Sequence, residues 1–184
     1  MGRMDRLDEN IKIDDKTFGQ LVNKYKERIY SVVLRIVRNN EEAKDLAQEA
    51  FVKAYRNRQS FRGESSFYTW VYRIAVNLAL NHVNRNRDRR AESIEDVNPE
   101  TFSSTPIDNL ERTELGQAIA DAIEQLPARQ RTVFVLRHYE DKAHAEIARI
   151  LSITEGAVKA NYHQAVHKMK AALNIYLTEG RRVI

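Results

Sequence analysis

The stretch from Ser60 to Arg87, SFRGESSFYTWVYRIAVNLALNHVNRNR, joins a polar loop to a dense aromatic run and a helix-compatible segment with a basic end. At about 100° per residue, one face of this helix collects apolar side chains and predicts a core-facing stripe: Val71, Ile74, Ala75 and Leu78. A neighbouring face carries one aromatic ring, one cation and three amides: Trp70, Arg73, Asn77, Asn81 and Asn84. Amides read base edges, a guanidinium binds phosphate, and an aromatic ring can stack on an unpaired base. The stretch therefore predicts a surface for single-stranded nucleic acid.

A purely structural interpretation of the same stretch stays open. Aromatic residues at helical spacing usually fill a core, and asparagines on a helix face are usually only solvated. Asparagine is nevertheless a poor helix former, so the four asparagines between Asn77 and Asn86 cost helix stability at surface positions. This cost favours a functional reason for the amides.

Composition limits the classes of protein that this chain can belong to. Its 184 residues suffice for one or two domains, and a net charge of +4 mildly favours polyanionic partners. The absence of cysteine excludes disulfides and thiolate zinc sites. No apolar run approaches the roughly 18 residues of a membrane span, and Met1 to Asn10 lacks the apolar core of a signal peptide. We expect a cytoplasmic protein without membrane insertion.

The remaining pattern is helical. Only six glycines and three prolines punctuate the chain, and no alternating pattern is long enough for a strand, so the sequence predicts an all-α fold. The first helix should begin near Asp14 or Asp15, since either carboxylate can cap it. Its apolar residues recur at spacings of three and four and predict a buried face: Phe18, Leu21, Val22, Tyr25, Ile29, Val32, Val33 and Ile36. Asn39 and Asn40 should end this helix and begin the next.

The second helix contains DLAQEAFVKAY, from Asp45 to Tyr55. Its mostly small apolar residues predict a seam that a neighbouring helix can approach closely: Ala47, Ala50, Phe51 and Ala54. The opposite face is charged and polar: Asp45, Gln48, Glu49 and Lys53. An acidic patch in a basic protein could dock a protein partner, and it could equally be a solvated face.

A change of composition divides the chain into two domains. Residues 88–107 are rich in charge, serine and proline without sustained periodicity, which predicts a flexible linker between a helical domain, 1–87, and a second domain, 108–184. Asp108 and Glu111 form a capping box for the helix that follows. The apolar face of that helix is Leu115, Ile119, Ala122, Ile123 and Leu126, and Pro127 then resets the chain.

The second domain ends in a predicted helix-turn-helix. Short helices are expected at Thr132–Tyr139 and Ala145–Leu151, followed by a tight turn in which Thr154 caps a longer last helix. Its inner residues are Val158, Tyr162, Ala165, Val166, Met169 and Leu173. Its outward residues, fit for a major groove, are Lys159, Asn161, His163, Gln164, His167 and Lys168. An ordinary helical hairpin is the alternative.

Motifs for catalysis are missing from the sequence. It contains no glycine-rich phosphate loop, nucleophile elbow or HExxH. His163 and His167 are four apart on one helix, but no carboxylate or thiol on that face completes a metal site. We expect no catalytic residue, metal or cofactor.

Three segments together resemble a bacterial RNA polymerase sigma factor of the two-domain extracytoplasmic-function (ECF) group. They are DLAQEAFVKAY, then SFRGESSFYTWVYRIAVNLALN, and, after the linker, LPARQRTVFVLRHYEDKAHAEIARILSITEGAVKANYHQAVHKMKAAL. The resemblance spans about Phe18 to Leu173, and its central block is far more specific than the helix-turn-helix alone.

The resemblance implies three sets of site residues. Docking on the clamp helices of the largest subunit of core RNA polymerase would use Asp45, Gln48, Glu49 and Lys53. Opening and holding the minus-ten promoter element as a single strand would use Ser60, Phe61, Arg62, Phe67, Tyr68, Trp70, Arg73, Asn77, Asn81 and Asn84. Reading the minus-thirty-five element as a duplex would use Thr154, Glu155, Lys159, Ala160, Asn161, His163 and Gln164. The linker would run through the polymerase interior, and an anti-sigma factor is a further expected partner.

The last helix departs from the pattern of the family. Relatives commonly carry serine-arginine, histidine-arginine and alanine-arginine where this chain has Ala160-Asn161, His163-Gln164 and Ala165-Val166, so three cations are missing. His144 stands where the family usually has an acidic or polar residue. The fold is expected to survive these changes, whereas upstream recognition should differ.

Two other functions fit parts of the sequence. The chain could be a regulator that binds duplex DNA through residues 127–175 without polymerase, or an anti-termination or interaction module whose basic face binds RNA. Promoter-dependent transcription with core polymerase separates the sigma factor from both.

Overall fold

A computed structural model describes residues 13–92 and 114–179, and every regular element in these ranges is a helix, which confirms the all-α prediction. The chain divides into two compact units, residues 1–94 and 95–184. The expected linker beyond residue 92 and the expected capping box at Asp108 and Glu111 lie outside the described residues. Among the described helices, none is long and apolar enough to cross a membrane.

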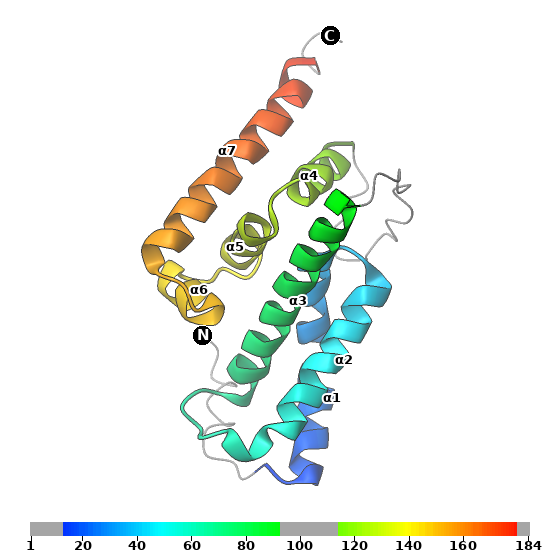
Figure 1. Cartoon of the computed structure of the whole chain (residues 1–184), viewed down its shortest axis with the longest axis vertical. Helices are drawn as coiled ribbons and strands as arrows, with labels where there is room; N and C mark the ends of the chain where they lie inside the picture. The colour runs from blue at the N-terminus through cyan, green and yellow to red at the C-terminus, as the bar shows by residue number, and fades with distance from the viewer. Residues whose placement is uncertain (1–12, 93–113, 180–184) are drawn as a thin grey trace. The chain divides into compact units, whose positions relative to one another are not determined.

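Unit 1 consists of three long helices that lie side by side (Figure 1). They are α1 (Asp15–Val37), α2 (Asn40–Arg56) and α3 (Phe67–Glu92), with a short 3-10 helix, η2 (Arg58–Ser60), before the loop that leads into α3. Each of the three helices packs against both others. Because no proline or glycine follows Arg87 until Pro99, α3 continues five residues into the segment predicted as linker.

The caps of unit 1 agree with the sequence. The Asp14 carboxylate accepts a hydrogen bond from the Thr17 amide at 2.7 Å and begins α1. This hydrogen bond holds the pKa of Asp14 below its usual value. The Asn39 side chain accepts from the first two free amides of α2, those of Glu41 and Glu42, at 3.0 and 3.1 Å. Both helix starts are thus fixed by side chains adjacent to them in sequence.

The core of unit 1 follows the predicted periodicity. All predicted core residues of α1 are buried except Val22, which is half-buried, and the α2 seam is buried as expected. On α3, Ile74 is only half-buried, while six residues outside the predicted stripe are buried: Phe67, Tyr68, Tyr72, Val76, Ala79 and Leu80. Since α3 packs on two helices, its buried face is wider than a single amphipathic stripe.

Unit 2 is built around its last helix. It contains α4 (Glu114–Glu124), α5 (Ala128–His138), α6 (His144–Leu151) and α7 (Glu155–Glu179), and α7 packs against each of the others. Its core cluster is Ala122, Ile123, Leu126, Phe134, Ala165 and Met169. The predicted core residue Leu115 is instead 45% exposed, because the part of α4 that packs against this cluster begins one turn later, at Ile119.

The start of α5 corrects a second expectation. The helix begins at Ala128, directly after Pro127, rather than at Thr132. The buried side chains of its first turn include two polar ones, Gln130 and Arg131. This turn therefore lacks the apolar spacing that predicts a helix from sequence. The Arg131 guanidinium donates to the Glu124 carbonyl at the end of α4, which satisfies part of this buried charge.

Candidate nucleic-acid and protein interfaces

The polar stripe on α3 lies beside the buried face of that helix. Arg73, Asn81 and Asn84 are exposed, and Trp70 and Asn77 are half-buried. The Asn77 side-chain amide donates to the Arg73 carbonyl at 2.8 Å, one turn earlier in the helix. A base that used this amide would replace a hydrogen bond within the helix by one to the base edge, so the exchange costs little.

The aromatic run that begins α3 divides between core and surface. Phe67 and Tyr68, both expected to contact DNA, are 0% and 7% exposed, so in this structure both rings are part of the core. Phe67 packs edge-on against Phe18 at 5.5 Å between ring centroids, and Tyr68 lies 5.1 Å from Tyr25. Both rings join α3 to α1, because the first turn of α3 faces α1.

The loop before α3 is held at both of its ends. Phe61, half-buried, lies on the Trp70 ring at 5.1 Å between centroids. At the other end, the Ser66 hydroxyl oxygen accepts from the Thr69 amide at 3.1 Å and caps α3. Between them Gly63 has a φ of 71°, a left-handed conformation that favours glycine. The exposed Arg62 side chain is thus carried by a loop with fixed ends.

A cluster that sequence reasoning missed lies just before this loop. The Tyr55 hydroxyl donates to the Asp15 carboxylate at 3.0 Å, and the Arg58 guanidinium contacts the same oxygen at 3.2 Å. The guanidinium also covers the Tyr55 ring at 4.0 Å. These contacts tie the start of α1 to the end of α2 and to η2. The sequence contained only a weak signal, a tyrosine three residues before an arginine.

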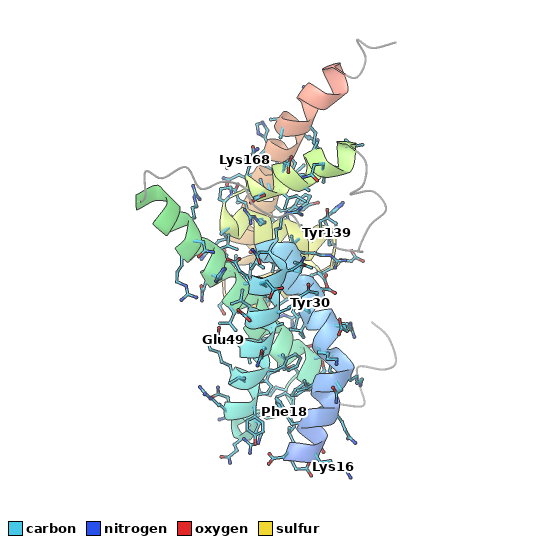
Figure 2. The ribbon with its side chains drawn as sticks, turned by 90° about the vertical axis from the view of Figure 1, so that its right-hand side faces the viewer. Lys16, Phe18, Tyr30, Glu49, Tyr139 and Lys168 are labelled. Atoms are coloured by element: carbon cyan, nitrogen blue, oxygen red, sulfur yellow. The ribbon has the colours of Figure 1, made fainter. Side chains whose placement is uncertain are left out.

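The polar face of α2 is exposed, as predicted. Asp45, Gln48, Glu49 and Lys53 all lie at the surface, and Glu49 projects away from the bundle (Figure 2). Glu49 and Lys53 form an ion pair at 2.9 Å, so the lysine partly neutralises the patch. Both side chains are nearly half exposed, where such a pair stabilises the helix only weakly.

An apolar groove of about 640 Å³ adjoins this face and was also missed. It runs between α1 and α2, and its apolar lining includes Phe18, Val22, Tyr30, Phe51, Val52 and Tyr55. Val52 is 40% exposed, whereas the alanines of the α2 seam are buried. Its position three residues after Glu49 was the available signal, since an apolar side chain beside a charged face suggests a mixed protein interface.

The second candidate surface is the α6–turn–α7 arrangement. The Thr154 hydroxyl accepts from the Ala157 amide at 3.1 Å, which confirms the predicted cap of α7. The outward residues are exposed on α7 and in the turn before it, except Asn161, which is half-buried: Thr154, Glu155, Lys159, Ala160, Asn161, His163 and Gln164. The Asn161 amide donates to the Ala157 carbonyl at 2.8 Å. The Asn161 amide would therefore have to leave a hydrogen bond within α7 before it could contact DNA.

The charge of this surface is reduced by an internal pair. Lys159 and Glu155 lie one turn apart on α7, with nitrogen and oxygen 2.9 Å apart. The hydrogen bond and the positive charge of Lys159 lower the pKa of Glu155, so the carboxylate stays ionised at neutral pH. The cation that a phosphate would contact is already paired with an anion.

We predict that Glu155→Gln strengthens binding to the minus-thirty-five duplex. The substitution releases the Lys159 ammonium and removes a negative charge near phosphate, so binding by the polymerase complex should tighten by about twofold to fivefold at low salt and fall more steeply with added salt. The measurement is a salt titration of promoter binding. Asp121→Asn on α4, an equal charge change, is the control. An unchanged affinity and salt slope would place Lys159 away from the DNA.

Histidine does not form a metal site in the described parts of the chain. No group of three or more histidine, aspartate and glutamate side chains there is arranged to hold a metal ion. His163 and His167 are both exposed on α7, and the ring of His144 lies 5.9 Å from that of Tyr162.

Comparison with known proteins identifies the family. The Sigma-70 region 2 family model matches residues 21–90, and the Sigma-70 region 4 family model matches residues 116–169. The RNA polymerase sigma-H factor of Pseudomonas aeruginosa is 36% identical over 176 residues, with 91% of each chain covered. The ECF RNA polymerase sigma-E factor of Escherichia coli is 37% identical over 163 residues, with 84% of this chain and 85% of the relative covered.

The solved structures agree in fold. CnrH, in a structure of its complex with the cytosolic domain of CnrY, is 21% identical with a TM-score of 0.65, and the match covers 93% of this chain and 97% of that chain. Two family regions in this order, over a shared all-α fold, define a sigma factor with two conserved regions. The chain belongs to the ECF group of RNA polymerase sigma factors.

Proposed function

We propose that this protein is an initiation specificity factor that binds core RNA polymerase and directs it to promoters. Membership of the ECF sigma family supports this function. The observation that carries it at the level of residues is the amide stripe of α3, which lies next to a loop with fixed ends. The protein contributes binding and base recognition, while RNA synthesis belongs to the polymerase, so we assign it no catalytic residue.

In unit 1, α2 would dock on the polymerase clamp helices. The support is an exposed acidic and polar face beside an apolar groove, a combination suited to a protein partner. Charged residues at the rim would orient the approach, while Val52 and Tyr55 would supply apolar contact area.

The α3 stripe and the Ser60–Ser66 loop would open the minus-ten element. Removing a base from the stack costs a few kcal/mol, and stacking on an aromatic ring returns roughly 1 to 3 kcal/mol. Since Phe67 and Tyr68 are buried, the rings with accessible area are Trp70 on α3 and Phe61 in the loop. Asn77 would contact the displaced base, and Arg73, Asn81 and Asn84 would follow the strand.

Unit 2 would place α7 in the major groove of the minus-thirty-five element. The cap at Thr154 and the short α6 before it give the geometry of a recognition helix. With one lysine paired and three family cations absent, binding here would rest on few phosphate contacts. We further propose action in the cytoplasm and control by an anti-sigma factor, the class of partner named for the similar structure from Bartonella quintana.

The proposed function predicts that tight promoter binding depends on polymerase. The net charge is only +4, and the two DNA surfaces belong to separate units, so each should bind weakly alone and gain when polymerase holds both at the correct spacing. The measurement compares promoter affinity of the free chain with that of the polymerase complex. Tight, sequence-specific binding of the free chain to duplex promoter would support the regulator alternative, and preferential binding to RNA would support the interaction module.

A further inference from the structure

A buried side chain of α5 contacts the recognition helix from beneath. The Gln130 side-chain nitrogen, Nε2, donates to Oε1 of Gln164 at 2.6 Å. Gln130 is 9% exposed, whereas Gln164 is an outward residue of α7. The two residues are 34 positions apart in sequence, so this contact fixes the exposed amide from a different helix.

The orientation of the pair follows from the cost of leaving each buried atom without a partner. In the observed arrangement, Gln130 Oε1 is the atom of this pair that is buried without a hydrogen-bond partner. Turning both amides would leave the Gln130 NH2 group without an acceptor instead. Buried donors without partners are rarer in proteins than buried carbonyl oxygens without partners. The pair therefore favours Gln164 as the acceptor.

This contact determines which half of the Gln164 amide can face DNA. Because Oε1 accepts from Gln130, the Nε2 group with its two hydrogens, on the other arm of the planar amide, is the half of Gln164 left for DNA. A glutamine that reads adenine in the usual two-bond manner needs both its oxygen and its nitrogen at the base edge. A glutamine that offers only N–H groups suits edges whose polar atoms all accept, which are N7 and O6 of guanine and O4 of thymine. Adenine N7 accepts as well, but the N6 amino group beside it is a donor and would face another donor.

We propose that Gln130 is a specificity-determining positioning residue: by holding the Gln164 oxygen, it makes Gln164 read a guanine or thymine edge of the minus-thirty-five element rather than adenine or cytosine. The inference rests on the proposed function and adds to it a base preference and a residue that does not touch DNA. It also gives this chain a neutral donor on the outward face of its last helix.

The test is transcription by the reconstituted polymerase complex from a promoter library randomised across the minus-thirty-five element. The unaltered chain should favour guanine or thymine at one position by about tenfold, the equivalent of about 1.4 kcal/mol. Gln164→Ala should remove the preference at that position. Gln130→Met, which fills the same space without donating, should reduce it to less than about twofold, since the amide is then free to turn.

Two further variants separate positioning from a general effect on the fold. The double substitution Gln130→Met with Gln164→Ala should show the same base preferences as Gln164→Ala alone. Gln130→Glu in mildly alkaline buffer places an acceptor beneath Gln164, so it should shift the preference toward adenine or cytosine, and it provides a second test if the methionine variant fails to fold. Gln125→Met, at an exposed position near the end of α4, is the matched control.

Three outcomes would overturn the proposal. The first is an unchanged base preference in Gln130→Met, and the second is a preference for adenine in the unaltered chain. The third is an equal change of base preference when Gln130→Met is made in the unaltered chain and in the Gln164→Ala chain. Each requires that the complex transcribes from the library, so each leaves the sigma function intact. If the chain directs no transcription from any library member, the proposed function itself fails, and with it the recognition role of Gln130.

Discussion

Asn77→Ala is expected to slow open-complex formation on duplex promoters by about tenfold to hundredfold. A well-formed side-chain contact to a base edge is worth about 1 to 3 kcal/mol, and each 1.4 kcal/mol corresponds to about a factor of ten. Only an unpaired base can use the Asn77 amide fully, so the loss falls on opening. The measurement is the rate of promoter opening by the polymerase complex, with the affinity for polymerase measured in parallel.

Asn77→Ala should not destabilise the fold, so slower opening would not reflect unfolding. The Asn77 side chain donates to the Arg73 carbonyl of its own helix, and that carbonyl also lies within the α3 backbone ladder. Alanine is a better helix former than asparagine by several tenths of a kcal/mol. The variant should therefore unfold at the same temperature as the unaltered protein or slightly above it.

Two controls locate the defect. A promoter already melted across its minus-ten element should restore opening in Asn77→Ala and leave mainly an altered base preference at one position. Asn84→Ala, exposed and nearer the end of α3, should weaken binding without changing base preference. Trp70→Ala is a poorer probe, because Trp70 packs on Phe61 and Phe67. A lost packing contact and a lost DNA contact would then have the same effect on promoter opening. If Asn77→Ala opens duplex promoters at the normal rate with the normal preference, the stripe is not the melting surface.

The second large effect is expected on α2. Asp45→Lys combined with Glu49→Lys should weaken binding to core polymerase by about tenfold or more, because charges that match the partner become charges that repel it, at a cost of several kcal/mol in unfavourable cases. Glu49→Lys also breaks the exposed pair with Lys53, which contributes only about 0.3 to 0.5 kcal/mol to helix stability. The measurement is the equilibrium affinity for core polymerase.

A matched charge reversal distinguishes docking from net charge. Asp121→Lys, on α4 of unit 2, makes the same change of charge as each single reversal on α2, and it should bind polymerase nearly as well as the unaltered chain. Circular dichroism should show equal helix content for all variants. Normal polymerase binding by both single reversals, Asp45→Lys and Glu49→Lys, would mean that the face is only solvated, and the docking surface would then have to lie elsewhere.

Much of the fold could be predicted because its information is local. The spacing of Phe18, Tyr25 and Ile29 defines one face of one helix, and the caps at Asp14 and Asn39 depend on residues at most three positions away. The same holds for Thr154 at the start of α7. Such features need no knowledge of which helix packs against which.

The features that the sequence did not predict depend instead on contacts between distant segments. Spacing cannot show that Phe67 and Tyr68 face α1 while Trp70 remains accessible, because that depends on where α1 lies. The polar first turn of α5 looks like a loop until Gln130 and Arg131 meet their partners on α7 and α4. The Asp15–Tyr55–Arg58 cluster likewise joins residues up to 43 positions apart in sequence. Contacts between distant segments decide these residues, and a single sequence does not contain that information.

Run-off transcription with purified core polymerase tests the central claim most directly. Three reactions are compared on one cognate promoter: core polymerase alone, core polymerase with this chain, and core polymerase with the Asn77→Ala chain. We predict a transcript from one defined start only when the unaltered chain is present, and a strongly reduced transcript with Asn77→Ala that a pre-melted minus-ten element restores. A chain that binds the promoter duplex tightly without polymerase, and that adds no defined start to core polymerase, would contradict the account.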